Sequence, residues 1–249
     1  MYSAIKQSAE YHLIKEFYGD KTSSRSKVPL INHINEGIVV LEDMEAGYHT
    51  ATAFCIHPLL QADEDLAANL DKVLTVASGR AVALALEYRS VANEYLSPKV
   101  TPVDEIRLSP LKAVNDMLIA DKVQNRKDFY TYHWSTHPRA KELETYFKEW
   151  LAVLGVEVDD YIYFCAAIDE NKHHESEIAQ LRNKVNTYED ILHKIQMNAD
   201  VVMNPGKVEK LIKGICDWSY AHRSGNGELS EQEQDERIAL ALNTLKFLR

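Results

Sequence analysis

The chain has 249 residues, of which 45% are hydrophobic, with only 9 glycines and 7 prolines. This composition is ordinary for a helix-rich globular protein and excludes a disordered or fibrous one. The length is compatible with one large domain, or with a domain of about 150 residues followed by an extension. A net charge of -10 argues against non-specific nucleic-acid binding, which needs clustered Lys and Arg, so an anionic ligand requires a local basic pocket.

Two features bear on the compartment. No stretch approaches the roughly 18 apolar residues of a membrane span, and the N-terminus lacks a basic region followed by an apolar run. We therefore expect no membrane span, no secretory signal and a cytoplasmic protein.

The cysteines are Cys55, Cys165 and Cys216, an odd number set far apart among apolar or aromatic neighbours. This favours buried free thiols over disulfides or a zinc cluster.

Apolar residues recur at spacings of three and four through most of the first 155 residues, as amphipathic helices require. No alternating pattern typical of strands competes with them. The spacing predicts helices at residues 3–18, 32–44, 48–56, 66–74, 80–96, 111–124 and 139–154. The predicted fold class is all-α, a helical bundle.

The dipeptide His57-Pro58 follows the third predicted helix. Proline removes a backbone donor from a helix and pushes the preceding residue out of the α region. The sequence therefore predicts that His57 lies at a kink or at a junction between two helices.

The second part of the chain is less regular. Residues 159–168 fit either a strand or a helix, and a seam with heptad spacing follows at Ile178, Leu181, Val185, Tyr188, Leu192 and Ile195. This seam is shorter than a firm coiled-coil prediction needs, so it indicates either a homodimer through residues 178–202 and the C-terminal helices or a helix packed on its own domain. Two more helices are predicted at residues 208–218 and 230–248, the last with a capping box. The predicted domains are residues 1–155 and a helical extension, residues 156–249.

Several polar groups are candidates for a site. Arg25 and Lys27 give the loop at residues 20–29 a basic lip, which is also what a solvated loop carries. His133 and His137 have the spacing of a metal pair, but no Glu follows the first and a proline follows the second, so polar loop residues are the simpler interpretation.

Four blocks, in order, carry a resemblance to a known family. They are "SAEYH" with Arg25 after it, Pro29-Leu30-Ile31-Asn32-His33, His57-Pro58-Leu59-Leu60-Gln61-Ala62, and Ile119-Ala120-Asp121-Lys122-Val123-Gln124-Asn125. These blocks, and the helix "AKELETYFKEWLAVLGV" after them, resemble the hydrolase domain of the RelA/SpoT family and the small alarmone hydrolases, which belong to the HD superfamily. The resemblance covers about the first 155 residues.

The resemblance implies a metal-dependent hydrolase of (p)ppGpp that uses Mn²⁺. Carried over by position, the metal ligands are His33, His57 and Asp121, while Arg25 contacts the nucleotide base and Asn125 lines the nucleotide pocket. Lys27 belongs to the same basic lip and is a further candidate for substrate binding. A bound metal ion activates water and polarises phosphorus in this chemistry.

The chain departs from the family pattern in its third block. Pro58 replaces the aspartate that would be the fourth metal ligand, and Gln61 and Ala62 replace the acids that orient water. Asp63 and Asp65 are the nearest substitutes, but neighbouring positions on a helix point in different directions, and residues 57 and 65 are about 12 Å apart along its axis. They fit equally well a solvated acidic helix start.

Two hypotheses follow. The first is a metal-dependent nucleotide phosphohydrolase acting on (p)ppGpp or a related nucleotide, with altered metal ligation. The second is a catalytically degenerate member that binds a nucleotide or a protein partner without hydrolysis. Asp121 and Asn125 gain their importance only through the resemblance, because a single Asp in an apolar helix is also compatible with a structural salt bridge.

Overall fold

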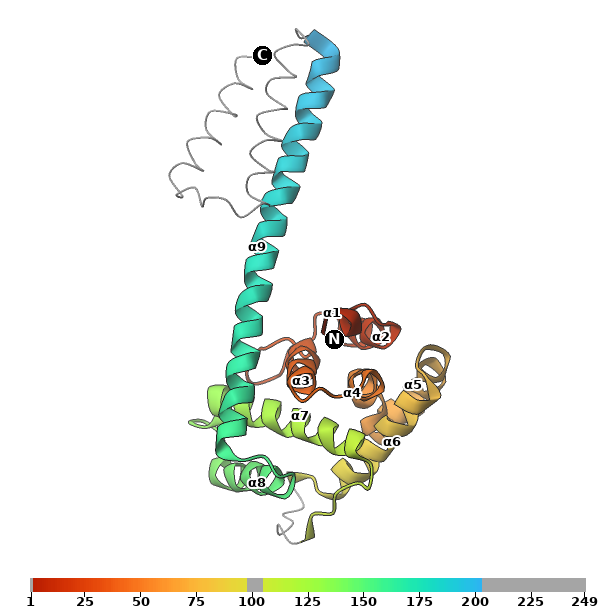
Figure 1. Cartoon of the computed structure of the whole chain (residues 1–249), viewed down its shortest axis with the longest axis vertical. Coiled ribbons are helices and arrows are strands. Elements are labelled where there is room, and N and C mark those ends of the chain that lie inside the picture. The colour runs from red at the N-terminus through yellow and green to blue at the C-terminus, as the bar shows by residue number, and fades with distance from the viewer. Residues whose placement is uncertain (1, 98–104, 203–249) are drawn as a thin grey trace. The chain divides into compact units, whose positions relative to one another are not determined.

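The computed structural model describes residues 2–97 and 105–202, and these residues fold into helices without a strand, so the all-α prediction is confirmed. An isolated bridge joins Thr22 and Pro29. The helices are α1 (Tyr2–Lys6), α2 (Ala9–Tyr18), α3 (Ile31–Asp43), α4 (Tyr48–Gln61), α5 (Asp63–Val76), α6 (Gly79–Glu94), α7 (Lys112–Asp128), the π-helix η3 (Phe129–His133), α8 (Ala140–Val153) and α9 (Val158–Val202) (Figure 1).

Helix α4 is the centre of the bundle. It packs against α2, α3, α5, α6 and α7 (Figure 1), and its side chains are buried on nearly every face. Its apolar residues join one core that also includes Tyr88 of α6, Met117 of α7 and Trp150 of α8. A helix that is apolar all round must be enclosed by others, and this enclosure holds His57 in the interior.

The predicted helix at residues 3–18 is divided into α1 and α2, so this prediction is wrong in its continuity. Ser8 takes an extended conformation and accepts a hydrogen bond from the backbone N–H of Tyr11 at 3.1 Å. Serine is a favoured residue at a helix N-terminus because its hydroxyl satisfies such a free donor. The cap therefore starts a new helix inside an uninterrupted apolar pattern.

The prediction of a junction between two helices at His57-Pro58 is also wrong. Helix α4 continues through Pro58 to Gln61, and the next helix starts at Asp63. Proline at position 58 leaves the carbonyl of Phe54, four residues earlier, without its usual backbone donor. The His57 ring takes that acceptor, since its Nδ1 lies 2.6 Å from the Phe54 oxygen. A side-chain hydrogen bond thus replaces the missing backbone one.

The chain divides into two units between His174 and Glu175, whereas the sequence placed a boundary at residue 155. The start of α9 belongs to the first unit because Ile168 is buried in its core and Lys172 forms an ion pair with Glu36 at 2.6 Å. The undecided residues 159–168 are helical. The two predicted helices beyond residue 202, and Cys216, lie outside the described residues.

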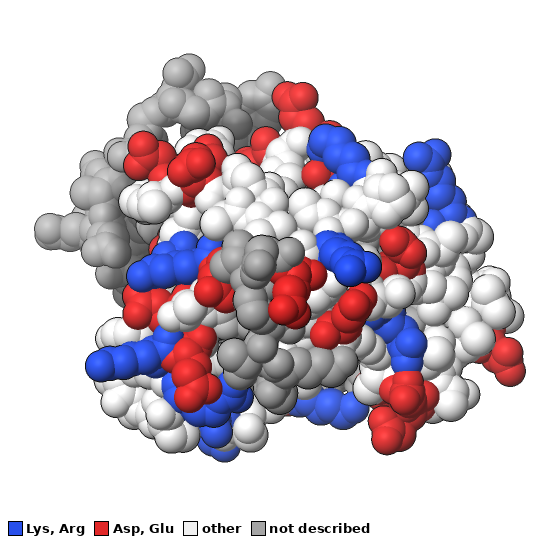
Figure 2. All heavy atoms as spheres, turned by 90° about the horizontal axis from the view of Figure 1, so that it is seen from below, with Lys and Arg blue, Asp and Glu red and all other residues white. Residues whose placement is uncertain are grey.

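Within the second unit, the seam residues Ile178, Leu181 and Val185 lie on α9 and are exposed. No helix in the described part of the chain is long and apolar enough to cross a membrane. Cys55 and Cys165 are free thiols, the first buried and the second partly exposed. On the face shown in Figure 2, basic and acidic side chains are interspersed.

Candidate functional site

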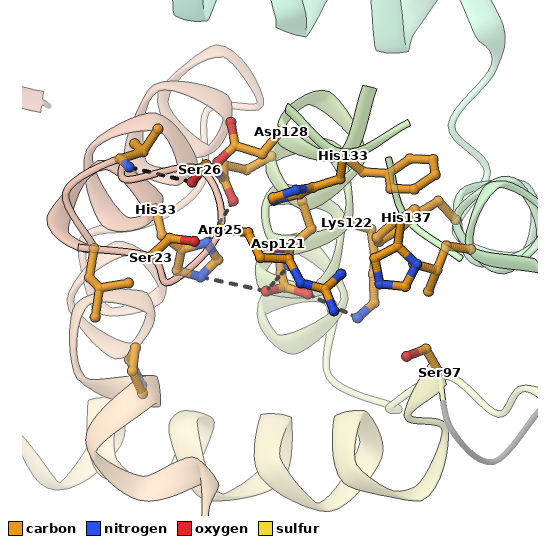
Figure 3. A pocket seen from close by; sticks show the side chains of 18 of the residues that line it. Ser23, Arg25, Ser26, His33, Ser97, Asp121, Lys122, Asp128, His133 and His137 are labelled. Carbon is orange, nitrogen blue, oxygen red and sulfur yellow. Dashed lines mark hydrogen bonds and ion pairs between the residues drawn. The ribbon is translucent and has the colours of Figure 1, made fainter. Parts of the chain in front are cut away.

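A pocket of about 550 Å³ opens beside α4 and is lined by the loop before α3, by α3, α4 and α7, and by the segment from η3 to α8. Figure 3 shows that side chains from these separate segments point into one space. The pocket includes every residue that the family resemblance names as a metal ligand, together with Arg25 and Asn125. Lys27 is exposed and does not line it.

His33, His57 and Asp121 meet at the floor of the pocket. The two Nε2 atoms are 3.4 Å apart, and His33 Nε2 is 3.6 Å from Asp121 Oδ1. One ligand atom from each residue lies within 4.8 Å of the others, which is the arrangement of a group that could hold a metal ion. His57 and Asp121 are buried, while His33 is partly open to the pocket.

Hydrogen bonds to the two Nδ1 atoms determine where the imidazole protons lie. The Phe54 carbonyl is only an acceptor, so His57 Nδ1 donates to it. His33 Nδ1 lies 2.7 Å from Gln124 Oε1, and the Gln124 amide nitrogen donates to Asp128 at 2.8 Å, which identifies the other amide atom as the acceptor. In the neutral rings both Nε2 atoms therefore present lone pairs to the same small volume, as metal-ligating histidines do.

Asp121 is held in its ionised form. Its Oδ2 accepts from Lys122 Nζ and its Oδ1 from Asn125 Nδ2, each at 2.9 Å. Burial raises the pKa of Asp121, but the Lys122 ammonium and the two histidines outweigh burial and lower the pKa to about 2. Burial lowers the pKa of His57 to about 3, and His33 adds to the shift. At neutral pH the floor thus has a carboxylate and a neutral His57 imidazole.

Lys122 connects the floor to the wall formed by α8. Its ammonium is buried and lies 5.4 Å from the ring centroid of Tyr146 and 5.1 Å from that of Trp150. Burial lowers the pKa of Lys122, yet the Asp121 carboxylate and Tyr146 together more than compensate, so the pKa is raised. The positive charge of Lys122 is consequently balanced by its ion pair with Asp121 and stabilised by cation–π contacts with the two aromatic rings.

The acids nearest to the positions where the resemblance expects catalytic acids do not line the pocket. Pro58 and Gln61 line it, whereas Ala62 is an exposed residue between α4 and α5. Asp63 forms an ion pair with Arg89 of α6, and neither it nor Asp65 lines the pocket. Besides Asp121, Asp128 is the carboxylate among the lining residues, and it faces the Gln124 amide.

Sequence reasoning missed two kinds of residue. Gln124 stands inside the quoted block Ile119–Asn125, yet nothing in its spacing indicated that its amide meets His33, 91 positions earlier. His133 and His137, interpreted as polar loop residues, both line the pocket. Their i, i+4 spacing correctly indicated that the two side chains lie in the same pocket. The histidine beside His57 and Asp121 is, however, His33.

A metal ion fits the donor set at the floor. Two imidazole nitrogens and one carboxylate oxygen form a three-ligand set that leaves coordination positions for water or substrate oxygens. This combination is compatible with Mn²⁺ and equally with Fe²⁺ or Zn²⁺. Comparison with family models, curated proteins and solved structures gave no match for the chain.

Proposed function

We propose that the chain is a metal-dependent nucleotide phosphohydrolase of the HD superfamily, similar to the hydrolase domains of the RelA/SpoT family. The observation that supports it best is the pair of Nε2 lone pairs of His33 and His57, directed at one point 3.4 Å apart beside the Asp121 carboxylate. Two lone pairs repel each other at this distance unless a metal ion or a proton lies between them. The proposed substrate is (p)ppGpp or a related nucleotide.

The residues around His33, His57 and Asp121 have distinct roles in this proposed function. A bound divalent ion supplies activation of water and polarisation of a phosphoryl group. Phe54 and Gln124 orient the two imidazoles, and Lys122 and Asn125 hold the Asp121 carboxylate. The apolar wall at Leu96, Leu143, Tyr146 and Phe147 offers a surface for a nucleobase.

A second function is favoured by a different observation. The positions of the two family acids are Gln61 and Ala62, and Asp63 is ion-paired with Arg89 and does not line the pocket. A pocket without these acids retains the groups that bind metal and nucleotide and lacks the groups that orient the attacking water. The alternative is therefore a protein that binds a nucleotide without hydrolysing it.

Metal content and phosphate release separate the two functions. The full chain, purified without chelator, is analysed for metals and assayed with Mn²⁺ for phosphate or pyrophosphate release from ppGpp and from other guanine and adenine nucleotides. The hydrolase predicts about one metal per chain and turnover that is abolished in His33→Ala and Asp121→Asn. His49→Ala is the matched control, because His49 is on α4 but bonds to Ser78 and does not line the pocket.

Bound metal and nucleotide without turnover would establish the alternative. Absence of metal in the wild-type chain, even after addition of Mn²⁺, Fe²⁺ and Zn²⁺ to the chelator-treated protein, would contradict both.

A further inference from the structure

The loop before α3 brings into the pocket a cation that has no partner among the described residues. Arg25 stands on a compact loop closed by backbone hydrogen bonds, from Ser23 N to Val28 O at 2.8 Å and from Lys27 N to Ser23 O at 3.1 Å. Figure 3 shows its side chain extending from this loop into the pocket. Within the described residues its guanidinium forms neither an ion pair nor a hydrogen bond, although a guanidinium has five N–H donors.

Two histidines face the same part of the pocket. His137 Nδ1 accepts a hydrogen bond from the backbone N–H of Arg139 at 3.1 Å, so a neutral His137 ring carries its proton on Nε2, as a donor. In Figure 3 this ring is directed toward the space that Arg25 enters. His133 also lines the pocket, and its ring has no hydrogen-bond partner within the described residues. The lowered pKa of His137, caused by desolvation and then by Arg25 and His133, agrees with their proximity.

The two carboxylates of the pocket interact with groups other than Arg25. Asp121 is paired with Lys122 and Asn125, and Asp128 accepts from Gln124 through Oδ2 and lies 3.8 Å from Lys127 Nζ through Oδ1, which has no hydrogen-bond partner. Among the described residues no carboxylate therefore pairs with Arg25, in a chain whose net charge is -10. Three such donors facing one cavity match the needs of a phosphate group, which accepts several charge-assisted hydrogen bonds.

We propose that Arg25, His133 and His137 form a second anion-binding subsite, which takes a phosphate group of the ligand other than the one at His33, His57 and Asp121. The family resemblance instead implies that Arg25 contacts the base. The proposal rests on the proposed function for the nucleotide as the ligand, and it narrows that ligand to one with at least two phosphate groups. The base then lies against the apolar wall.

Inorganic pyrophosphate, added in the presence of EDTA, tests the subsite without the metal. We expect saturable binding to the full chain by isothermal titration calorimetry at constant ionic strength. Arg25→Ala should weaken it about tenfold or more, which corresponds to about 1.4 kcal/mol, since hydrogen bonds to charged groups are the stronger ones. His137→Ala and His133→Ala should each weaken binding, by less than Arg25→Ala.

Lys27→Ala is the matched control, since it removes the same charge from the same loop outside the pocket, and it should leave the affinity within about twofold. His33→Ala should also retain pyrophosphate binding, which separates this subsite from the metal ligands. Absence of pyrophosphate binding to the wild-type chain, or equal losses in Arg25→Ala and Lys27→Ala, would overturn the proposal. Loss of metal binding alone would leave it standing. Thermal unfolding of each variant checks that the fold is intact.

Discussion

His57 and Phe54 are joined by a hydrogen bond of 2.6 Å that exists because residue 58 is a proline. The Phe54 carbonyl would otherwise accept the backbone N–H of residue 58, and proline has none. The proline that stands where the family resemblance would place a fourth metal ligand thus also frees the acceptor that orients the His57 ring.

Pro58→Asp and Pro58→Ala separate these two effects. Both variants restore a backbone donor that competes for the Phe54 carbonyl, but only Pro58→Asp adds a carboxylate, at a position that lines the pocket. We expect Pro58→Asp to bind Mn²⁺ about tenfold or more tightly than Pro58→Ala, because Mn²⁺ prefers oxygen ligands. Titration of the chelator-treated proteins with Mn²⁺ measures this. Equal affinities would show that residue 58 does not reach the ion.

Gln124 should act as a positioning residue for His33. In Gln124→Ala the His33 Nδ1 proton loses its acceptor, and second-layer hydrogen bonds of this kind contribute about 10–100-fold to metal affinity. The metal dissociation constant should rise by that factor with little change in the melting temperature. Gln61→Ala removes the same side chain from a lining position that forms no hydrogen bond to a histidine among the described residues, and it should bind metal normally. A similar loss in both variants would refute the assigned role.

Gly37 of α3 packs against the ring of Phe54, and a methyl group there would overlap that ring. The ring centroid of Phe54 lies 5.5 Å from that of His33 and 4.8 Å from that of His57. Gly37→Ala should therefore lower the free energy of unfolding by about 1–3 kcal/mol and also weaken metal binding. Gly79→Ala is the control, because no atom lies within 4 Å of its added Cβ. Chemical denaturation, which should show little change or a gain for Gly79→Ala, measures the difference.

The buried, neutral His57 makes the metal-free fold sensitive to acid. Its pKa is about 3 in the folded chain and 6.5 ordinarily, so the unfolded chain binds an extra proton between these values. The free energy of unfolding that is present above pH 6.5 consequently decreases as the pH falls from 6.5 toward 3. By pH ~4 this loss is about 3 kcal/mol, at about 1.4 kcal/mol per pH unit. Denaturation in EDTA measures it, and His57→Gln should show a smaller pH dependence. The same dependence in both proteins would contradict this origin.

The fold class and the meeting of the two histidines with Asp121 could be anticipated from the sequence. Helical periodicity is a local property, and the resemblance supplied the order of the blocks. The continuation of α4 through Pro58 could not be anticipated, because the compensating bond comes from a side chain whose direction depends on burial. The contact of Gln124 with His33 arises from the packing of α7 on α3, which no short pattern encodes.

The contact between Lys122 and Trp150 should make the fluorescence of Trp150 sensitive to the pocket. The indole is fully buried, donates from Nε1 to the Tyr95 carbonyl at 3.4 Å, and has the Lys122 ammonium 5.1 Å from its ring centroid. Indole emission responds to nearby charge, and this ammonium is itself held by Asp121. A change in charge at the pocket floor should therefore alter the fluorescence of Trp150, so the chain contains its own unlabelled reporter of occupancy.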